Sequence, residues 1–339
     1  MTAILILAIG LYPLTDSKEL KMKKIYLLFL SMYLAITSIQ AQSYPNRPIK
    51  IIVPFQPGGA TDINARLVSE FMSIQFGQPV VVENVTGASG NVGLERVSKA
   101  TPDGYTILLA SAVNTSNYAS RPENSIDLLT HFKPIGKIGD NVFSLVVSPK
   151  LGVKSVAELI ALAKLNPGTL SYATVGVGSS HHLVTEMFRS VTDIDVIHVP
   201  FRGEGSAIPE LMSGRISFAF LVTVRSLIDR GQLVALATTS DGTWPPLKNI
   251  PSLSSLGYSG IKQNGWNGLM VPIGTPDEIV RKLNETLNNG LRSEKAKNIL
   301  ESIAWQTSEG TPENMANQIR TDHKVYRQVI IDRNLKMTE

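Results

Sequence analysis

The fold is constrained most by a repeated order of short apolar, β-branched runs and helical segments that begins near Ile49. Each run has the length of a buried strand, and the segment that follows it spaces apolar residues as a helix does. Residues 62–76, for example, place Ile63, Leu67 and Phe71 on one helical face. Parallel strands need a crossover between them, so strands that alternate with helices favour parallel layers. The sequence therefore predicts an α/β protein.

The pattern runs once to about residue 114 and then restarts, which predicts two lobes. Strands are expected at residues 48–55, 80–82, 105–110, 142–147, 170–174, 196–200, 216–221, 233–238 and 266–272. Helices are expected at residues 62–76, up to 99, 155–165, 180–190, 276–293, 294–303 and 312–331, with Ser155 and Glu158 forming a capping box. The C-terminal helices would complete the first lobe, and Trp266 and Trp305 are expected in the core.

The first forty residues are typical of a secretory leader. Lys23 and Lys24 precede an apolar run at residues 25–36, which is shorter than the ~20 residues of a membrane-spanning helix. We expect cleavage after Ala41 and therefore export to the periplasm. Residues 1–21 contain a second short apolar run, so either Met1 or Met22 is the start of translation.

Composition excludes several classes of function. The chain has no cysteine, so it has no disulfide, zinc-thiolate site or cysteine nucleophile. The formal net charge is only +4, with never more than two Lys or Arg in succession, which argues against nucleic-acid binding. A hydrophobic share of 43% over 339 residues is enough for a sizeable core.

Three strand ends carry turns rich in Gly, Ser, Thr or Asn, each of which leads into a helix: residues 57–62, 87–93 and 176–181. Ligands of open parallel sheets bind beyond the carboxyl ends of the strands. Free N–H groups at a helix N-terminus favour an anion even without Arg or Lys. Any one turn could simply connect a strand to a helix, but three together predict a site for a carboxylate.

Enzymatic alternatives fit less well. Residues 176–181 lack the third glycine of a dinucleotide fingerprint, and residues 87–90 do not form the nucleophile elbow of a serine hydrolase. His181 and His182 are adjacent on a helix and point apart, which disfavours a metal site. We therefore expect no enzymatic activity, no catalytic residues, no cofactor and no metal.

Several of these turns belong to a longer series of motifs over about residues 44–339. The motifs are Val53-Pro54-Phe55 with Pro57-Gly58-Gly59, Asp62 and Ala65-Arg66; Gly87 to Gly93; Asp103-Gly104-Tyr105; Tyr172-Ala173-Thr174 with Gly176-Val177-Gly178 and Ser180-His181-His182-Leu183; His198 to Gly203; Pro251-Ser252-Leu253 with Gly257-Tyr258; and Trp266 with Gly268-Leu269. In this order the series resembles the Bug/TctC family. That family comprises the periplasmic substrate-binding proteins of tripartite tricarboxylate transporters.

The resemblance implies a type II periplasmic-binding-protein fold, with two α/β lobes joined by crossover strands and a ligand cleft between them. Residues 1–41 would be removed, residues 44–143 plus 268–339 would form lobe one, and residues 144–267 would form lobe two. The crossovers are expected near residues 142–149 and 265–272.

The resemblance also implies the ligand, the partners and the site. The ligand would be a small organic carboxylate, the partners would be the membrane components of a transporter of this type, and the protein would work as a monomer. Sensing through a signalling partner, or action as an orphan receptor, is the alternative. Carried over by position, the ligand-binding residues are Phe55, Gly58, Gly59, Thr61, Ser89, Asn91, Ser111 and Asn114 from lobe one, and Thr174, Gly178, Ser179, Ser180 and His182 from lobe two.

The chain departs from the family's pattern at two acidic positions, which are Ser217 and Leu221 here. We include Leu221 among the expected site residues, because an acid there could pair with a ligand ammonium and Leu221 cannot. The departure predicts a carboxylate without an amino group, with an apolar or aromatic body. Asp62 is expected to be a first-turn helix charge paired with Arg66, and Arg202 forms either an ion pair or a contact with a distal carboxylate.

Overall fold

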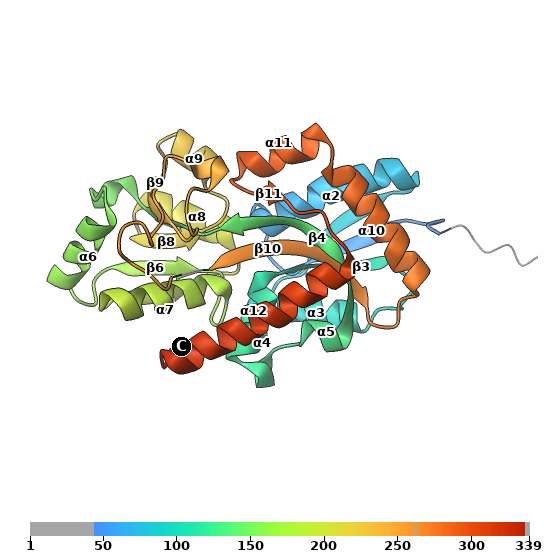
Figure 1. Ribbon diagram of the computed structural model, residues 1–339, viewed down its shortest axis with the longest axis horizontal. Helices are drawn as coiled ribbons and strands as arrows, with labels where there is room; N and C mark the ends of the chain where they lie inside the picture. The colour runs from blue at the N-terminus through green and yellow to red at the C-terminus, as the bar shows by residue number, and fades with distance from the viewer. Residues whose placement is uncertain (1–43, 262, 336–339) are drawn as a thin grey trace, which may run out of the picture. The chain divides into compact units, whose positions relative to one another are not determined.

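A computed structural model describes residues 44–261 and 263–335. The chain divides into a leading unit, Met1–Asn46, and a compact unit, Arg47–Glu339, which holds every helix and strand described here (Figure 1). The predicted leader, with its cleavage site after Ala41 and its two alternative starts, lies outside the described residues.

The first sheet has six strands in the order β11-β4-β10-β3-β1-β2. The strands are β1 (Ile49–Val53), β2 (Val80–Asn84), β3 (Thr106–Ser111), β4 (Phe132–Val142), β10 (Asn264–Pro272) and β11 (Gln306–Thr307). Strand β1 pairs in parallel with β2 and β3, whereas β10 runs antiparallel to both β3 and β4. β-Branched and apolar residues of β1 and β3, such as Ile51 and Leu108, are completely buried between the covering helices.

The second sheet has five strands in the order β7-β6-β8-β5-β9. They are β5 (Ser144–Val147), β6 (Ser171–Thr174), β7 (Ile197–Pro200), β8 (Phe218–Leu221) and β9 (Val234–Thr238). Strand β6 pairs in parallel with β7 and β8, and β5 is antiparallel to β8 and β9. The α/β class predicted from the alternation is therefore confirmed.

Helices cover both sheets. They are α2 (Ala60–Phe76), α3 (Asn91–Ser98), α4 (Ala112–Ser120), α5 (Leu128–His131), α6 (Val156–Leu165), α7 (Ser180–Thr192), α8 (Glu204–Ser213), α9 (Arg225–Asp229), α10 (Asp277–Leu291), α11 (Glu294–Ser302) and α12 (Pro312–Asp332). Short 3₁₀ turns lie at η2 (Ala88–Gly90), η3 (Pro122–Asn124), η4 (Pro149–Leu151) and η5 (Pro245–Leu247).

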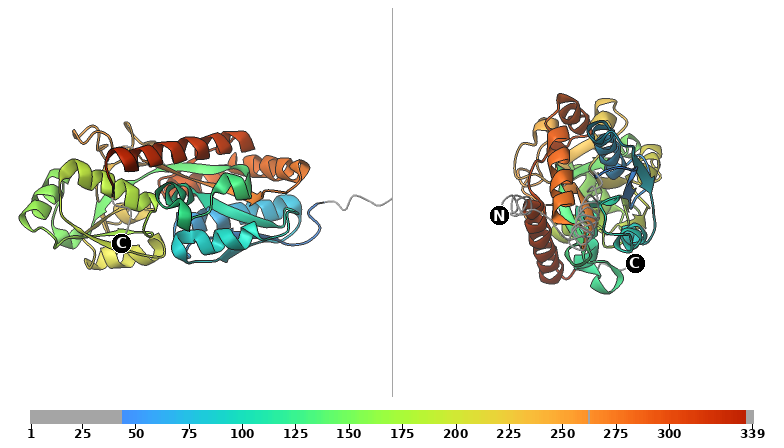
Figure 2. Two further views of the ribbon diagram at one scale, coloured as in Figure 1. Left: turned by 90° about the horizontal axis from the view of Figure 1, so that it is seen from below. Right: turned by 90° about the vertical axis from the view of Figure 1, so that its right-hand side faces the viewer.

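The two sheets are joined by extended strands. Strand β4 passes through Phe143 directly into β5 of the second sheet, and β10 returns beside β4 in antiparallel register. Figure 2 shows the elements around the two sheets as separate groups with the green β4 running from one to the other. These groups are called the first and second lobe below. Their residue boundaries stay a prediction.

Six elements go beyond the expectation from the sequence: β4 before residue 142, β11, α4, α5, α8 and α9. The three longest of them are β4, α4 and α8. The β4 segment contains Pro134 and two glycines, and α8 contains Gly205 and Pro209, residues that oppose regular structure. Helix α4 is rich in Asn, Thr and Ser, yet it is almost wholly buried against α12 and α7. Tertiary packing overrides local propensity in all three.

The capping box predicted at α6 is formed only in part. The Ser155 hydroxyl accepts a hydrogen bond from the Glu158 N–H at 3.1 Å, as expected. The Glu158 carboxylate, however, accepts from the Lys154 N–H at 2.7 Å rather than from the N-cap residue. The carboxylate therefore satisfies a backbone donor one position further out.

Candidate functional site

One pocket draws its walls from both lobes. It encloses about 470 Å³ of empty space, including its open mouth. Its lining residues are Phe55, Gln56, Gly59, Ala60, Thr61, Ser111, Ala112, Val113, Asn141, Phe143, Val175, Ser180, His181, Gly203, Glu204, Val222, Gly265, Trp266, Asn267 and Trp305. This size matches a small organic molecule rather than a macromolecular segment.

Four helices begin at this pocket. The N-terminal residues of α2 and α4 come from the first lobe, and those of α7 and α8 from the second. Helices α2 and α8 start after Gly59 and Gly203, which provide no side chain to cap the first N–H groups. The positive ends of four helix dipoles therefore point toward one small volume, which favours a negatively charged group there.

The second lobe contributes a buried ion pair to the pocket wall. His181 Nε2 lies 3.0 Å from Glu204 Oε1, and both side chains are about 95% buried. Glu204 Oε1 also accepts a hydrogen bond from the Val222 N–H at 2.7 Å, and its Oε2 accepts one from the Thr223 hydroxyl. Three hydrogen-bond donors therefore converge on this one carboxylate.

Three buried polar atoms of the pocket residues have no hydrogen-bond partner among the described residues: His181 Nδ1, Asn141 Oδ1 and Asn267 Nδ2. Asn141 pairs with Gly265 across β4 and β10, and Asn267 pairs with Ser111 across β10 and β3. Buried polar groups are normally satisfied. These atoms are therefore available to a bound ligand or to water.

Aromatic rings form much of the remaining wall: Phe55, Phe143, Trp266 and Trp305. Trp305 Nε1 donates to the Val222 carbonyl at 2.8 Å, and Trp266 Nε1 donates to Asp322 Oδ2 at 2.7 Å. Burial raises the pKa of the Asp322 carboxyl, and the bond from Trp266 only partly offsets this. Trp266 and Trp305 are buried as expected, and they also line the pocket.

Five of the predicted site residues line this pocket: Phe55, Gly59, Thr61, Ser111 and Ser180. They stand at or beside the starts of α2, α4 and α7. The structure therefore brings together the parts of the prediction that depend on helix N-termini, from both lobes.

The two glycine-rich turns at residues 87–93 and 176–181 contact each other across the lobes. Ser89 Oγ donates to the Val177 carbonyl at 3.4 Å, and Ser116 Oγ donates to the Gly178 carbonyl at 3.0 Å. A Cβ on Gly176 would lie 2.5 Å from Ser89 Oγ. Ser89 lines a second groove, together with the exposed Arg202.

The remaining predicted residues of the first lobe have structural partners. Asn114 Oδ1 accepts from the Ser111 N–H at 2.9 Å and so fixes the start of α4. Asn91 Nδ2 donates to the Asn124 carbonyl at 2.9 Å, and the Gly58 N–H donates to Asp62 Oδ2 at 3.1 Å. None of the three is among the lining residues of the pocket.

Leu221 lies in the buried cluster beneath α8, with Val146, Ala219 and Leu211, and outside the pocket lining. The next residue, Val222, does line the pocket. Successive residues of a strand point to opposite faces of the sheet. Leu221 therefore points into the core, whereas Val222 points into the pocket. The predicted link between Leu221 and the ligand therefore loses its geometric basis.

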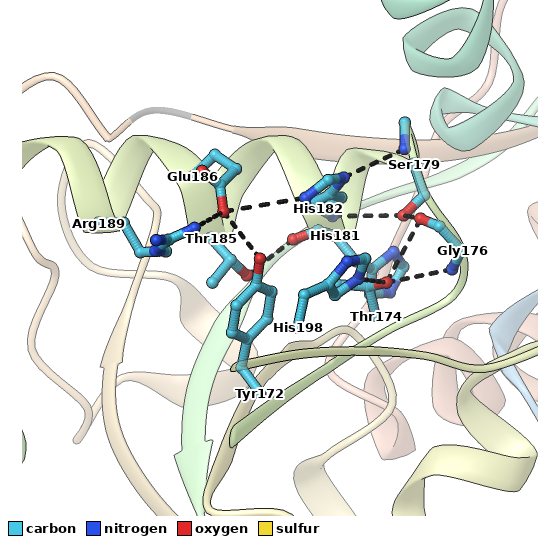
Figure 3. Close-up of polar contacts among 11 residues, drawn as sticks. Tyr172, Thr174, Gly176, Ser179, His181, His182, Thr185, Glu186, Arg189 and His198 are labelled. Carbon is cyan, nitrogen blue, oxygen red and sulfur yellow. Dashed lines mark hydrogen bonds and ion pairs between the residues drawn. The ribbon is translucent and has the colours of Figure 1, made fainter. Parts of the chain in front are cut away.

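His182, Thr174 and Ser179 belong to a buried cluster behind the pocket (Figure 3). His182 Nδ1 accepts a hydrogen bond from the Gly178 N–H at 3.2 Å, and the His182 ring stacks on His198 with centroids 4.2 Å apart. His198 Nε2 lies 2.7 Å from Thr174 Oγ1. Burial lowers the pKa of both imidazoles to about 4, so both are neutral near pH 7.

Asp62 and Arg66 form the expected pair at the start of α2. Arg66 donates from Nε and Nη2 to the two carboxylate oxygens at 2.9 and 3.0 Å. Burial alone would raise the pKa of Asp62, but the bonds from Arg66, Gly58 and Asn84 outweigh it and hold that pKa below its ordinary value. Arg202 forms no hydrogen bond or ion pair with any described residue, which leaves its role open.

Several lining residues were missed by sequence reasoning. Glu204 directly follows the motif that ends at Gly203, and His181 was weighed only as a metal ligand. Asn141 and Asn267 lie on the strands that connect the lobes. Strand β4 also contains two Lys and an Asp, so no local signal singled out Asn141. Among residues 44–261 and 263–335, no group of three or more His, Asp or Glu could hold a metal ion, and no helix is long and apolar enough to cross a membrane.

The Trp305 indole should support the pocket through the Val222 peptide, whose N–H binds Glu204. We expect Trp305→Phe to lower the free energy of unfolding by about 1–2 kcal/mol, because the buried Val222 carbonyl loses its donor. We also expect weaker ligand binding. Trp244→Phe removes a similar 2.8 Å bond, to Ala304, outside the pocket lining and should affect stability alone. Urea denaturation and ligand titration of both variants would check this, and equal affinities would contradict it.

Two α/β lobes, two connecting strands and a pocket walled from both lobes define a solute-binding protein of the periplasmic-binding type. A family model described as "Tripartite tricarboxylate transporter family receptor" matches residues 64–335. The chain belongs to this family, the Bug/TctC family of periplasmic binding proteins.

Relatives and solved structures agree with this assignment. Protein BugT of Bordetella pertussis is 36% identical over 275 residues, which cover 79% of this chain and 82% of BugT. A structure described as "R. palustris Rpa4515 with adipate" is 31% identical with a TM-score of 0.83, covering 86% of this chain and 99% of that one. The periplasmic binding protein BugD is 29% identical with a TM-score of 0.82, covering 86% and 99%.

Proposed function

We propose that this protein is exported to the periplasm and captures a small organic carboxylate in the pocket between its lobes. It then delivers the ligand to the membrane components of a tripartite tricarboxylate-type transporter. It acts by binding and release, without catalysis. The observation that carries the proposal is the convergence of four helix N-termini, two from each lobe, on one pocket.

The pocket suits such a ligand on physical grounds. Backbone N–H groups and helix dipoles favour a carboxylate, and a low-dielectric surrounding strengthens each hydrogen bond to it. The rings of Phe55, Phe143, Trp266 and Trp305 favour an apolar or aromatic body. The relative described with adipate, a dicarboxylate, lends support by resemblance.

The ligand is proposed to lack an amino group, now for a reason other than Leu221. The acid in the pocket wall is Glu204, whose oxygens already accept three hydrogen bonds. A ligand ammonium would have to compete with His181 for this carboxylate. Comparing glutamate with glutarate, which differ by the amino group, tests the point directly: tighter binding of glutamate would overturn it.

A thermal-shift panel on protein purified from a periplasmic extract tests the binding function. The panel contains mono-, di- and tricarboxylates, aromatic acids, amino acids, sugars and nucleotides. A ligand at ~100 times its dissociation constant should add ~2.7 kcal/mol to the free energy of unfolding. We expect a response confined to certain carboxylates. A response to sugars or nucleotides with none to acids would overturn the proposal. The N-terminal sequence of the same sample tests cleavage after Ala41.

Transport and sensing are separated by uptake in cells. Deleting the gene should abolish high-affinity uptake of the radiolabelled carboxylate, and restoring it should recover uptake. Unchanged uptake together with a lost transcriptional response to the ligand would favour the sensing alternative.

A further inference from the structure

The pocket contains a negative charge where the proposed ligand also carries one. Glu204 is 4% exposed, lines the pocket and accepts hydrogen bonds from His181, the Val222 N–H and the Thr223 hydroxyl. The four helix N-termini, each equivalent to roughly half an elementary charge, supply about two charges in all, which Glu204 and one ligand carboxylate together would use up, and one of these termini already faces Glu204.

His181 is bonded on one side only. Its Nε2 must carry a hydrogen, because its partner Glu204 Oε1 is an acceptor that also receives the Val222 N–H. Its Nδ1 is buried and has no hydrogen-bond partner among the described residues. In the neutral ring this Nδ1 is a lone pair, which repels a carboxylate oxygen. In the protonated ring it is a second N–H donor.

One proton would therefore resolve two problems together. Added to His181, it neutralises the charge of Glu204 and converts the unpaired Nδ1 into a donor for the ligand. The Phe143 ring packs edge-on against His181 at 4.9 Å between centroids and adds an apolar wall beside the pair. A buried charge needs such compensation, because the low-dielectric interior does not screen it.

We infer that the His181–Glu204 pair makes capture of the carboxylate proton-coupled: the ligand enters the pocket together with one proton, which resides on His181 between Glu204 and the ligand. This inference rests on the proposed function. It assigns His181 and Glu204 as the pair that holds this proton beside the ligand.

Other charged groups near the pocket already have partners or stand apart. On the elements around His181, they are Asp62 with Arg66 on α2, Asp140 with Lys137 on β4, Arg121 after α4 bound to the Val177 carbonyl, Glu186 with Arg189 and Tyr172 beside His182 and His198, Glu210 with Arg215 on α8, Asp229 with Arg225 after β8, Asp322 bound to Trp266, and the exposed Arg202. Among the lining residues, Glu204 and His181 are the titratable side chains.

Isothermal titration calorimetry with glutarate, adipate and benzoate tests the inference. Titrations near pH 8 in two buffers of different ionisation enthalpy count the protons taken up on binding. We expect close to one proton per carboxylate. We also expect the dissociation constant to rise with pH, close to tenfold per pH unit over the range in which the free protein does not already hold the proton. Binding without proton uptake and without pH dependence would overturn the inference and leave the proposed function intact.

Two variants locate the proton. Glu204→Gln keeps the shape of the side chain and removes its charge. His181→Gln keeps a donor for Glu204 and removes the titrating ring. Both variants should abolish proton uptake, and their dissociation constants should vary by no more than about threefold with pH. His131→Gln, which removes an exposed histidine on α5, is the matched control and should retain both effects. Proton uptake that persists in both pocket variants would refute the assignment. Failure of every carboxylate to bind the wild-type protein would refute the proposed function as well. If a variant does not fold, the proton count of the wild-type protein still decides the inference.

Discussion

Gly205→Ala is expected to weaken ligand binding at least tenfold while leaving the unliganded protein folded. A Cβ at Gly205, in the first turn of α8, would lie 2.4 Å from the Pro57 carbonyl oxygen of the β1–α2 loop. Both atoms belong to stiff backbone, so the start of α8 has to move away from the loop. That movement separates Glu204 from Gly59. The two residues face each other across the pocket, where a Cβ built on Gly59 would lie 3.8 Å from the Glu204 Cβ.

Stability should respond differently from affinity. Alanine is favoured over glycine within a helix by about 1 kcal/mol. This preference offsets part of the strain that the added Cβ introduces against the Pro57 carbonyl. Gly242→Ala is the matched control, because a Cβ there has no other atom within 4 Å. Calorimetric titration with the carboxylate found in the panel, and thermal melts without it, give the two readings. Unchanged affinity in Gly205→Ala would show that the contact of α8 with the β1–α2 loop does not limit binding.

The second large effect is loss of stability in mild acid. Burial lowers the pKa values of His182 and His198 from 6.5 to about 4, assisted by Arg189 and Arg121 for His182 and by His182 for His198. Between these limits the unfolded chain binds protons that the folded protein excludes. The free energy of unfolding is therefore full above about pH 6.5, falls as the pH drops, and levels off below about pH 4.

The expected loss is substantial. From pH 6.5 to about pH 5, each lowered pKa corresponds to a loss of about 2 kcal/mol, before allowance for the coupling between the stacked rings. Protonation of His182 also removes the acceptor for the Gly178 N–H and so releases the turn that contacts α4. The lobes are expected to lose this contact before the sheets unfold.

Urea denaturation between about pH 7.5 and 5 measures this effect. The double variant His182→Gln, His198→Gln should have a much flatter profile, since glutamine does not titrate and its amide oxygen can still accept the Gly178 N–H. His131→Gln should retain the wild-type slope. A wild-type protein as stable near pH 5 as near pH 7.5 would contradict the lowered pKa values.

Some of the predicted site residues carry a local signal that reports directly on helix starts. Gly59, Thr61, Ser111 and Ser180 stand at strand-to-helix turns, and all four line the pocket. The same kind of signal predicted that Ser89 and Gly178 face the ligand. In the structure their two turns, residues 87–93 and 176–181, contact each other. Nothing local distinguishes a turn that faces a ligand from one that faces another turn.

The sequence by itself determined the alternation of strands and helices, the α/β class, the family and the Asp62–Arg66 pair, because each depends on residues close together in the chain or on motifs in order. Only the tertiary structure decided that α4 and α8 are helices, that Leu221 is in the core, and that His181 meets Glu204 beside Asn141 and Asn267. These outcomes depend on contacts between segments far apart in the chain, where burial and unpaired hydrogen-bonding groups outweigh local propensity.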